Sequence, residues 1–166
     1  MEKDTVITKT ADLCESGLYR YALTRIWKPE AGLVGFIMLN PSTADAEVDD
    51  ATIRKCMGFA DKWGYGGITV ANLFAYRETS PAVLKDNAYE IDCVGPRNNA
   101  AILKAANDSQ LLIAAWGNHG KLLNRDKAVR KLLSEHLLHS LDGLSKTGQP
   151  NHPLYKKYTS ARMVMA

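Results

Sequence analysis

The stretch GFIMLNPSTADAEVDD, residues 35–50, decides the fold class. With the two residues before it, its first part is an apolar run without alternation, which is typical of a strand buried on both faces. The run ends at Asn40-Pro41, and small polar residues and four carboxylates follow. A plain turn needs only two or three such residues. We therefore interpret the stretch as a buried strand whose end contributes to a functional site.

The segments 67–72 and 110–116 are apolar runs of the same kind, and 139–145 is a weaker candidate for a fourth strand. Helical patterns lie between these segments. Helices are expected from near Ala51, where Asp49 and Asp50 are suitable caps, from Pro81, and over 95–108 and 124–139. Strands that alternate with helices predict an α/β, three-layer fold around a central, mostly parallel four-stranded sheet.

Residues 18–27, LYRYALTRIW, alternate roughly between the two faces of a strand. We expect this segment at the sheet edge, antiparallel, in a hairpin with 33–39. The chain has 166 residues, of which 46% are hydrophobic, which predicts a single domain over residues 1–166. Its net charge of +3 permits a nucleic-acid partner without requiring one.

The three cysteines are far apart and form no C-x-x-C pair, which disfavours a disulfide framework or a zinc ribbon and favours a reducing compartment. The first ten residues are charged and polar, unlike a signal peptide. No apolar run approaches the roughly 18 residues of a membrane span. We expect a cytoplasmic protein with no membrane partner and no cofactor; the oligomeric state is left open.

Polar residues follow each predicted parallel strand, and parallel sheets bind ligands beyond the carboxyl ends of their strands. Asn40, Asn72, Gly117 and His152 are expected to lie around one cleft there. The predicted catalytic residues are Asn40, Asp45 and His152. The predicted substrate-binding residues are Pro41, Ser42, Thr43, Asn72, Arg77, Trp116, Gly117, Lys146 and Tyr155. No metal ligands are assigned.

Each candidate also has a structural interpretation. Asn40 could cap a turn, and Asn72 could satisfy backbone groups. Trp116 could belong to the core or stack on a base. The segment SKTGQPNHPLYKKY, residues 145–158, mixes lysines with tyrosines, which suits phosphates and bases as well as a solvated tail. His136 and His139 are expected near a helix end, with no further zinc ligands in view.

The acidic segment after Asn40 has three interpretations. Asp50 could cap the following helix, which is the commonest role of such a residue. Asp45 and Asp49 could hold magnesium, which needs only one or two carboxylates. Asp45, the carboxylate nearest Asn40, could act in catalysis. The same charges, with Glu47, would repel a phosphate backbone, so we expect a small nucleotide or an unpaired base rather than duplex DNA.

Five segments, LNPSTAD, DDATIR, NLFAYR, AWG and GQPNHPLY, resemble the pattern of a bacterial and phage family catalogued as domain of unknown function 1643. The name of that family implies no activity. More distantly, the sequence resembles the uracil-DNA glycosylase superfamily. There a strand ends in a catalytic Asp or Asn followed by Pro, as in MLNPS, and a later strand carries an Asn that reads the base, as in VANLF.

The superfamily pattern continues with a strand that ends in W-G, similar to AAWGNHG, and a loop H-P-S-P-L, of which NHPLY resembles a shortened form. The resemblance implies a glycosylase-like fold and a hydrolase of N-glycosidase type. The expected ligand is a nucleobase-containing small molecule or single-stranded nucleic acid. A non-catalytic nucleotide-binding or nucleic-acid-binding module and a metal-dependent hydrolase that uses residues 45–50 remain as alternatives.

Overall fold

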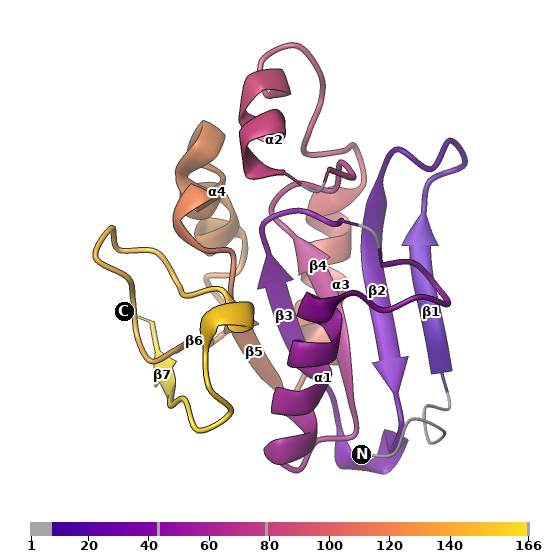
Figure 1. Cartoon of the computed structure of the whole chain (residues 1–166), viewed down its shortest axis with the longest axis vertical. Coiled ribbons are helices and arrows are strands. Elements are labelled where there is room, and N and C mark those ends of the chain that lie inside the picture. Colours follow the sequence, from indigo (N-terminus) through magenta and orange to yellow (C-terminus); the bar gives the residue numbers. More distant parts are fainter. Residues whose placement is uncertain (1–7, 43, 79, 166) are drawn as a thin grey trace.

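The computed structural model describes residues 8–42, 44–78 and 80–165. Within these residues, seven strands form one mixed sheet in the order β1-β2-β4-β3-β5-β6-β7 (Figure 1). The strands are β1 (Thr8–Leu13), β2 (Arg20–Ile26), β3 (Val34–Met38), β4 (Gly67–Asn72), β5 (Leu111–Ala114), β6 (Leu138–Leu141) and β7 (Arg162–Val164). The helices are α1 (Ala51–Lys62), α2 (Pro81–Asn87), α3 (Asn98–Asp108) and α4 (Arg125–Leu132).

The predicted parallel centre of the sheet is confirmed. β3 pairs in parallel with β4 on one side and with β5 on the other, and β5 pairs in parallel with β6. All five residues of β3 are buried, as its unbroken apolar sequence predicts. Met38 lies opposite Asn72 in the register. The C-terminal ends of β3 and β4 are therefore neighbours at one edge of the sheet.

The predicted hairpin of residues 18–27 with 33–39 is wrong. β2 pairs with β4, antiparallel, and β1 pairs with the outer side of β2, so β2 is not an edge strand. The physical reason is that β4 and β5 occupy both sides of β3 and leave it no free edge. β7 adds another antiparallel strand beyond β6. The sheet is thus larger than the four parallel strands and one edge strand that were expected.

Successive side chains of the central strands point to opposite faces of the sheet, so each face has its own hydrophobic core. Phe36 and Val70 pack with Ile53 and other residues of α1 on one face. Ile37 and Ala71 belong to the opposite cluster, which includes residues of α2, α3 and α4. One helix therefore covers one face of the sheet and three helices cover the other, which gives the expected three layers.

The cap predicted at Asp50 is confirmed, and Ser80 caps a second helix, for which no cap was predicted from the sequence. The Asp50 side chain accepts the Ile53 N–H at 2.8 Å at the start of α1, and the hydroxyl of Ser80 accepts the Val83 N–H at the start of α2. The fourth predicted helix is too long. α4 ends at Leu132, and Leu138 belongs to β6, where it pairs with Leu112.

The reason for this error is that the run LLSEHLLH satisfies a helical period and a strand equally well. The two histidines accordingly do not share a helix, because His139 lies on β6 and His136 lies in the turn before it. Leu137, which lies between α4 and β6, is exposed.

Candidate functional site

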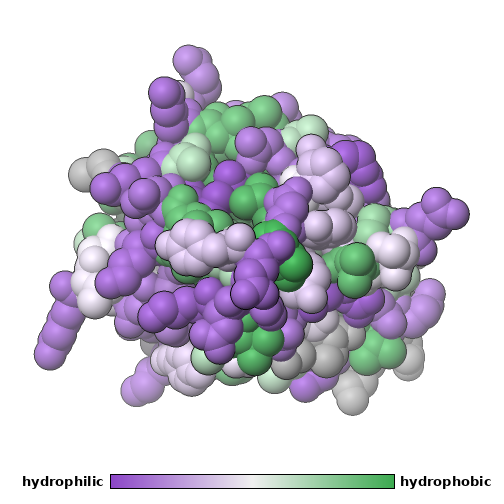
Figure 2. Space-filling model, turned by 90° about the horizontal axis from the view of Figure 1, so that it is seen from above, coloured by the Kyte–Doolittle hydropathy of each residue, from purple (hydrophilic) through white to green (hydrophobic). Residues whose placement is uncertain are grey.

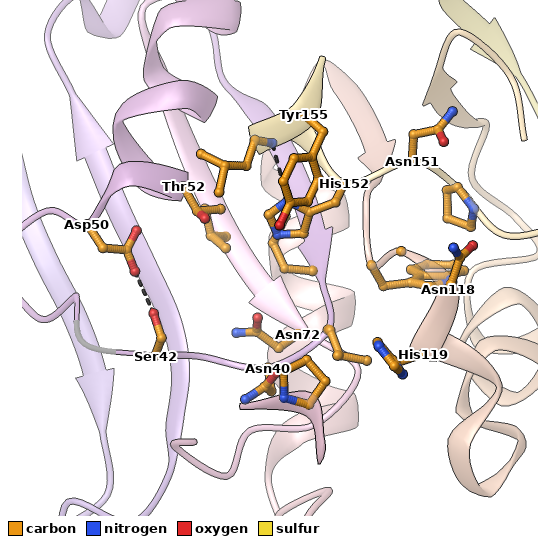
Figure 3. Close-up of a pocket in the computed structure, with 18 of the residues that line it drawn as sticks. Asn40, Ser42, Asp50, Thr52, Asn72, Asn118, His119, Asn151, His152 and Tyr155 are labelled. Carbon is orange, nitrogen blue, oxygen red and sulfur yellow. Dashed lines mark hydrogen bonds between the residues drawn. The ribbon is translucent and has the colours of Figure 1, made fainter. Parts of the chain in front are cut away.

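A pocket of about 490 Å³ lies at the C-terminal ends of β3 and β4, on the side of the sheet that α1 covers. Hydrophilic residues predominate on this end of the molecule, with apolar patches among them (Figure 2). Seven residues predicted from the sequence line the pocket: Asn40, Ser42, Asn72, Trp116, Gly117, His152 and Tyr155. They come from segments far apart in the chain, and Figure 3 shows how several of them face a common space.

Asn72, the last residue of β4, is the least accessible polar group of the pocket, with 1% of its surface exposed. Neither Oδ1 nor Nδ2 of its side chain has a hydrogen-bond partner among the described residues. Buried polar groups in proteins are nearly always hydrogen-bonded, because leaving them unpaired is costly. A buried, unpaired donor and acceptor in a pocket wall are therefore suited to a ligand that supplies both partners.

Asn40 follows β3 and is held by its amide nitrogen. Nδ2 donates to the backbone carbonyl of Glu78 and, at 3.4 Å, to that of Pro41. These bonds clamp the turn after β3 against the segment after β4, so part of the role of Asn40 is structural. Because Nδ2 is engaged, Oδ1 is the side-chain atom that remains to accept a hydrogen bond from a ligand or water.

His152 begins the short helix η4 (Pro153–Tyr155) and lines the pocket with its imidazole. Its Nδ1 accepts the backbone N–H of Leu154 at 3.2 Å. Burial lowers the pKa of His152 below its ordinary value of 6.5, while the charge of Asp50 acts in the opposite direction. A neutral imidazole whose Nδ1 accepts carries its proton on Nε2. His152 is therefore set up as a neutral donor.

Ser42 and Asp50 form a second fixed pair in the pocket wall. The Ser42 hydroxyl donates to Oδ2 of Asp50 at 2.6 Å, while Oδ1 caps α1 (Figure 3). Both carboxylate oxygens of Asp50 are thus engaged in holding the start of α1 to the segment after β3. The cap interpretation of Asp50 is confirmed.

Asp45 does not line the pocket. Its Oδ1 accepts the backbone N–H groups of Glu47 and Val48, each at 2.8 Å, and these bonds hold the pKa of its carboxyl below the ordinary value. Asp49 pairs with the buried Arg25 at 2.7 Å. The acidic residues build a loop, and no three His, Cys, Asp or Glu side chains gather as a metal site within residues 8–42, 44–78 and 80–165.

The remaining predicted residues lie outside the pocket lining or outside the described residues. Arg77 is half-buried and Lys146 is an exposed turn residue, and neither lines the pocket. Pro41 is buried, and its carbonyl accepts the Glu78 N–H at 3.1 Å. Thr43 lies outside the described residues.

The two aromatic candidates have different environments. Trp116 is 1% exposed, and its indole N–H donates to Oε1 of Gln149 at 2.8 Å. Gln149 in turn donates to Asp126 at 2.9 Å. Trp116 is thus a packed wall of the pocket rather than an open stacking surface. Tyr155 is 84% exposed, and its ring centroid lies 5.8 Å from that of His152.

The sequence alone did not point to several residues of the lining, among them Arg20, Thr52 and Asn151. Arg20 is buried at the start of β2, and its Nη1 donates to the Ala44 carbonyl at 2.7 Å. A usable signal was present, because the predicted strand 18–27 contains two arginines, Arg20 and Arg25. Charged residues in a strand that packs on both sides require a specific partner.

No helix in the described part of the chain combines the length and the apolar character needed to cross a membrane. Comparison with curated proteins and with solved structures gives no match. One family model does match, and it covers residues 20–154, which include every described residue that lines the pocket except Tyr155 and Lys156. The chain therefore belongs to the family described as Protein of unknown function (DUF1643).

Proposed function

We propose that the pocket binds the base of a nucleoside, a nucleotide or an unpaired stretch of nucleic acid, and that it hydrolyses the N-glycosidic bond. The observation that carries the proposal is the buried carboxamide of Asn72, whose donor and acceptor are both unpaired among the described residues. The edge of a nucleobase presents a donor and an acceptor side by side, which is the complement of a carboxamide.

His152 supplies a group for the leaving base. In the reaction, the oxygen of water forms a bond to the anomeric carbon while the bond from that carbon to the base nitrogen breaks. The bonding electrons pass to the base, and negative charge develops on its oxygen. The Nε2–H of a neutral His152 is a hydrogen-bond donor for that oxygen. The base finally takes up a proton equivalent to the one that water releases.

Asn40 supplies a position for the water. Its amide cannot act as a general base, but its Oδ1 can accept a hydrogen bond from water. Positive charge on the sugar in the transition state makes a weakly activated water sufficient. The resemblance to the uracil-DNA glycosylase superfamily supports these roles, because its Asn-Pro and base-reading Asn motifs match Asn40-Pro41 and Asn72.

The test is a panel of nucleosides, nucleotides, single-stranded oligonucleotides and uracil-containing duplexes, assayed for binding by calorimetry and for released base by chromatography. We expect binding that Asn72→Ala weakens and base release that His152→Ala lowers. Asn107→Ala, an exposed asparagine of α3 outside the pocket, is the matched control. No binding of any compound to the wild-type protein would contradict the proposal.

Binding without hydrolysis is the second candidate. Two observations favour it: both oxygens of Asp50 are already engaged, and an amide, Asn40, follows the end of β3. Tight binding of a nucleobase compound without base release would select this function. A reaction that requires added magnesium would instead select the metal-dependent alternative.

A further inference from the structure

Two arginines of β2 are buried, Arg20 with 3% and Arg25 with 0% of the residue exposed, and they differ in their partners. Arg25 is satisfied on all sides. Its Nε pairs with Asp49 at 2.7 Å, Nη1 donates to the carbonyls of Thr10 and Thr24, and Nη2 donates to that of Asp45 at 2.5 Å. A buried cation is normally stable only with this kind of compensation.

Arg20 lacks such compensation. Its guanidinium makes one hydrogen bond to a protein group among the described residues, from Nη1 to the Ala44 carbonyl. Its Nε is buried without a partner, and no described carboxylate lies within ion-pair distance of it. The chain therefore keeps a charge in its interior at an energetic cost that the structure offsets only in part, through the charges of Asp50 and Asp45 at distances beyond an ion pair.

The cation persists at neutral pH. Burial lowers the pKa of Arg20 to about 10, with Asp50 as the largest opposing influence, so the guanidinium remains protonated under ordinary conditions. Arg20 lines the same pocket as Asn72. The other Lys or Arg side chain in that lining, Lys156, already pairs with the carboxylate of Asp142 at 3.6 Å. An anion that enters the pocket thus finds one buried cation in the described lining that no described carboxylate contacts directly.

We propose that Arg20 is the phosphate anchor of this pocket, and that its ligand is a nucleoside monophosphate rather than a nucleoside. The inference rests on the proposed function for the base, which Asn72 would contact, and adds the second recognition element. The planar fork of a guanidinium offers several N–H donors to phosphate oxygens, and such charge-assisted bonds are the strong ones. A bound phosphate would supply both the missing counter-charge and the missing acceptor.

The experiment compares each nucleoside 5′-monophosphate with its own nucleoside by calorimetric titration of the full chain. We expect at least one monophosphate to bind about 10- to 100-fold more tightly than its nucleoside. In Arg20→Gln the two affinities should become equal, and Arg20→Lys should restore part of the difference. Arg54→Gln removes an exposed cation of α1 that lies outside the pocket lining, and this control should keep the full difference.

Thermal unfolding separates a binding role from a structural one. Arg20→Gln removes an uncompensated buried charge, so its Tm without ligand should be equal to or higher than that of the wild type. Arg25→Gln leaves the Asp49 carboxylate without its ion-pair partner and should lower the Tm clearly. If Arg20→Gln instead lowers the Tm as much as Arg25→Gln does, Arg20 is a structural residue and the inference is wrong.

The outcomes also distinguish this inference from the proposed function. Nucleosides that bind as tightly as their monophosphates would overturn the phosphate anchor and leave the base pocket standing. Inorganic phosphate that binds in an Arg20-dependent way, when no nucleobase compound binds, would support the anchor and contradict the base pocket. No binding of monophosphates, nucleosides or inorganic phosphate to the wild-type protein would overturn both.

Discussion

The backbone N–H of Leu154 donates to Nδ1 of His152 across 3.2 Å, so the ring cannot keep this bond and gain a proton on Nδ1 at the same time (Figure 3). Protonation would turn Nδ1 into a second donor that faces the N–H. Burial disfavours the charged imidazole as well, and both effects act against the cation. The geometry thus maintains a neutral ring whose Nε2–H is available to a ligand.

The first prediction concerns pH. Because burial lowers the pKa of His152 below 6.5, the decline of base release at acid pH should have its midpoint below 6.5. An NMR titration of the imidazole, assigned with His152→Gln, gives the pKa directly. A midpoint at or above 6.5, in the titration or in the pH profile, would show that the ring is not held neutral.

The lowered pKa of His152 also makes the free energy of unfolding depend on pH. The unfolded chain has the ordinary histidine pKa and the folded chain a lower one, so the unfolded state binds the proton more readily between the two values. The contribution of His152 to the free energy of unfolding should be fully present above pH 6.5 and should be lost as the pH falls through the folded pKa. In His152→Gln, this component of the pH dependence should be absent.

The second prediction compares two buried asparagines. Asn72→Leu removes an unpaired carboxamide and fills its place with apolar atoms, so the free energy of unfolding should rise by about 1 kcal/mol while binding of base is lost. Asn98 donates from Nδ2 to the carbonyls of Asn72 and Leu73, at 2.9 and 3.0 Å. Asn98→Leu should therefore lower the free energy of unfolding by about 1–3 kcal/mol.

Chemical denaturation measures both variants of this pair. If the free energy of unfolding rises in Asn72→Leu and falls in Asn98→Leu, Asn72 is a residue kept for a ligand at the expense of stability. If Asn72→Leu destabilises the protein as strongly as Asn98→Leu, the Asn72 carboxamide has a structural partner, such as a bound water, and its assignment to a base edge fails.

The parallel pairing of β3, β4 and β5 was predictable because each of these three strands is an apolar run, and apolar runs separated by helices have few other solutions. The pairing of β2 was not predictable from the sequence. Its alternating pattern fits any strand that has one face less buried than the other, whatever its neighbour in the sheet. Its true neighbour is fixed by the closure of β3 on both sides, which is a property of the whole sheet.

Some residues of the site could be predicted from the sequence and others could not. Asn40 and Asn72 were found because they follow apolar runs directly, and the order of the strands brings strand ends together. Arg20 was missed because nothing local separates it from Arg25, which lies on the same strand. Only the partners differ: Arg20 donates to Ala44, whereas Arg25 contacts Asp45 and Asp49. These partners lie in the loop 44–49, whose path the sequence does not determine.

The third prediction concerns the acidic loop. Asp49→Asn removes the carboxylate of the Arg25 pair and should lower the free energy of unfolding by about 3 kcal/mol, because the arginine stays buried. Glu47→Gln, at an exposed position of the same loop, is the control and should change little. Urea denaturation measures the difference. Equal stability of the two variants would mean that the ion pair does not hold the loop.

The fourth prediction is that magnesium leaves the Tm unchanged. Asp45 and Asp49 each use Oδ1, and Asp50 uses both carboxylate oxygens, for bonds within the protein. In addition, no three His, Cys, Asp or Glu side chains of the described residues gather as a metal site. Thermal unfolding with magnesium and with a chelator tests this directly. A rise in Tm with magnesium that Asp45→Asn abolishes would instead support a metal site in the loop.

The last prediction separates binding from turnover at the end of β3. If Asn40 positions the attacking water, Asn40→Ala should lower the rate of base release by about 10²-fold while the affinity for the nucleobase compound changes little. Asn72→Ala should do the opposite and weaken the affinity first, because it removes contacts made by the base in the ground state. Single-turnover kinetics together with calorimetry measure the two effects separately.

Asn40→Asp completes this comparison. The substitution places an oxygen where Nδ2 donates to the carbonyl of Glu78, so the turn after β3 loses its clamp and the Tm should fall. A carboxylate could nevertheless activate water better than an amide does. If Asn40→Ala and Asn40→Asp lower the affinity as much as the rate, Asn40 shapes the pocket through its clamp on Glu78 alone, and its part in placing water is wrong.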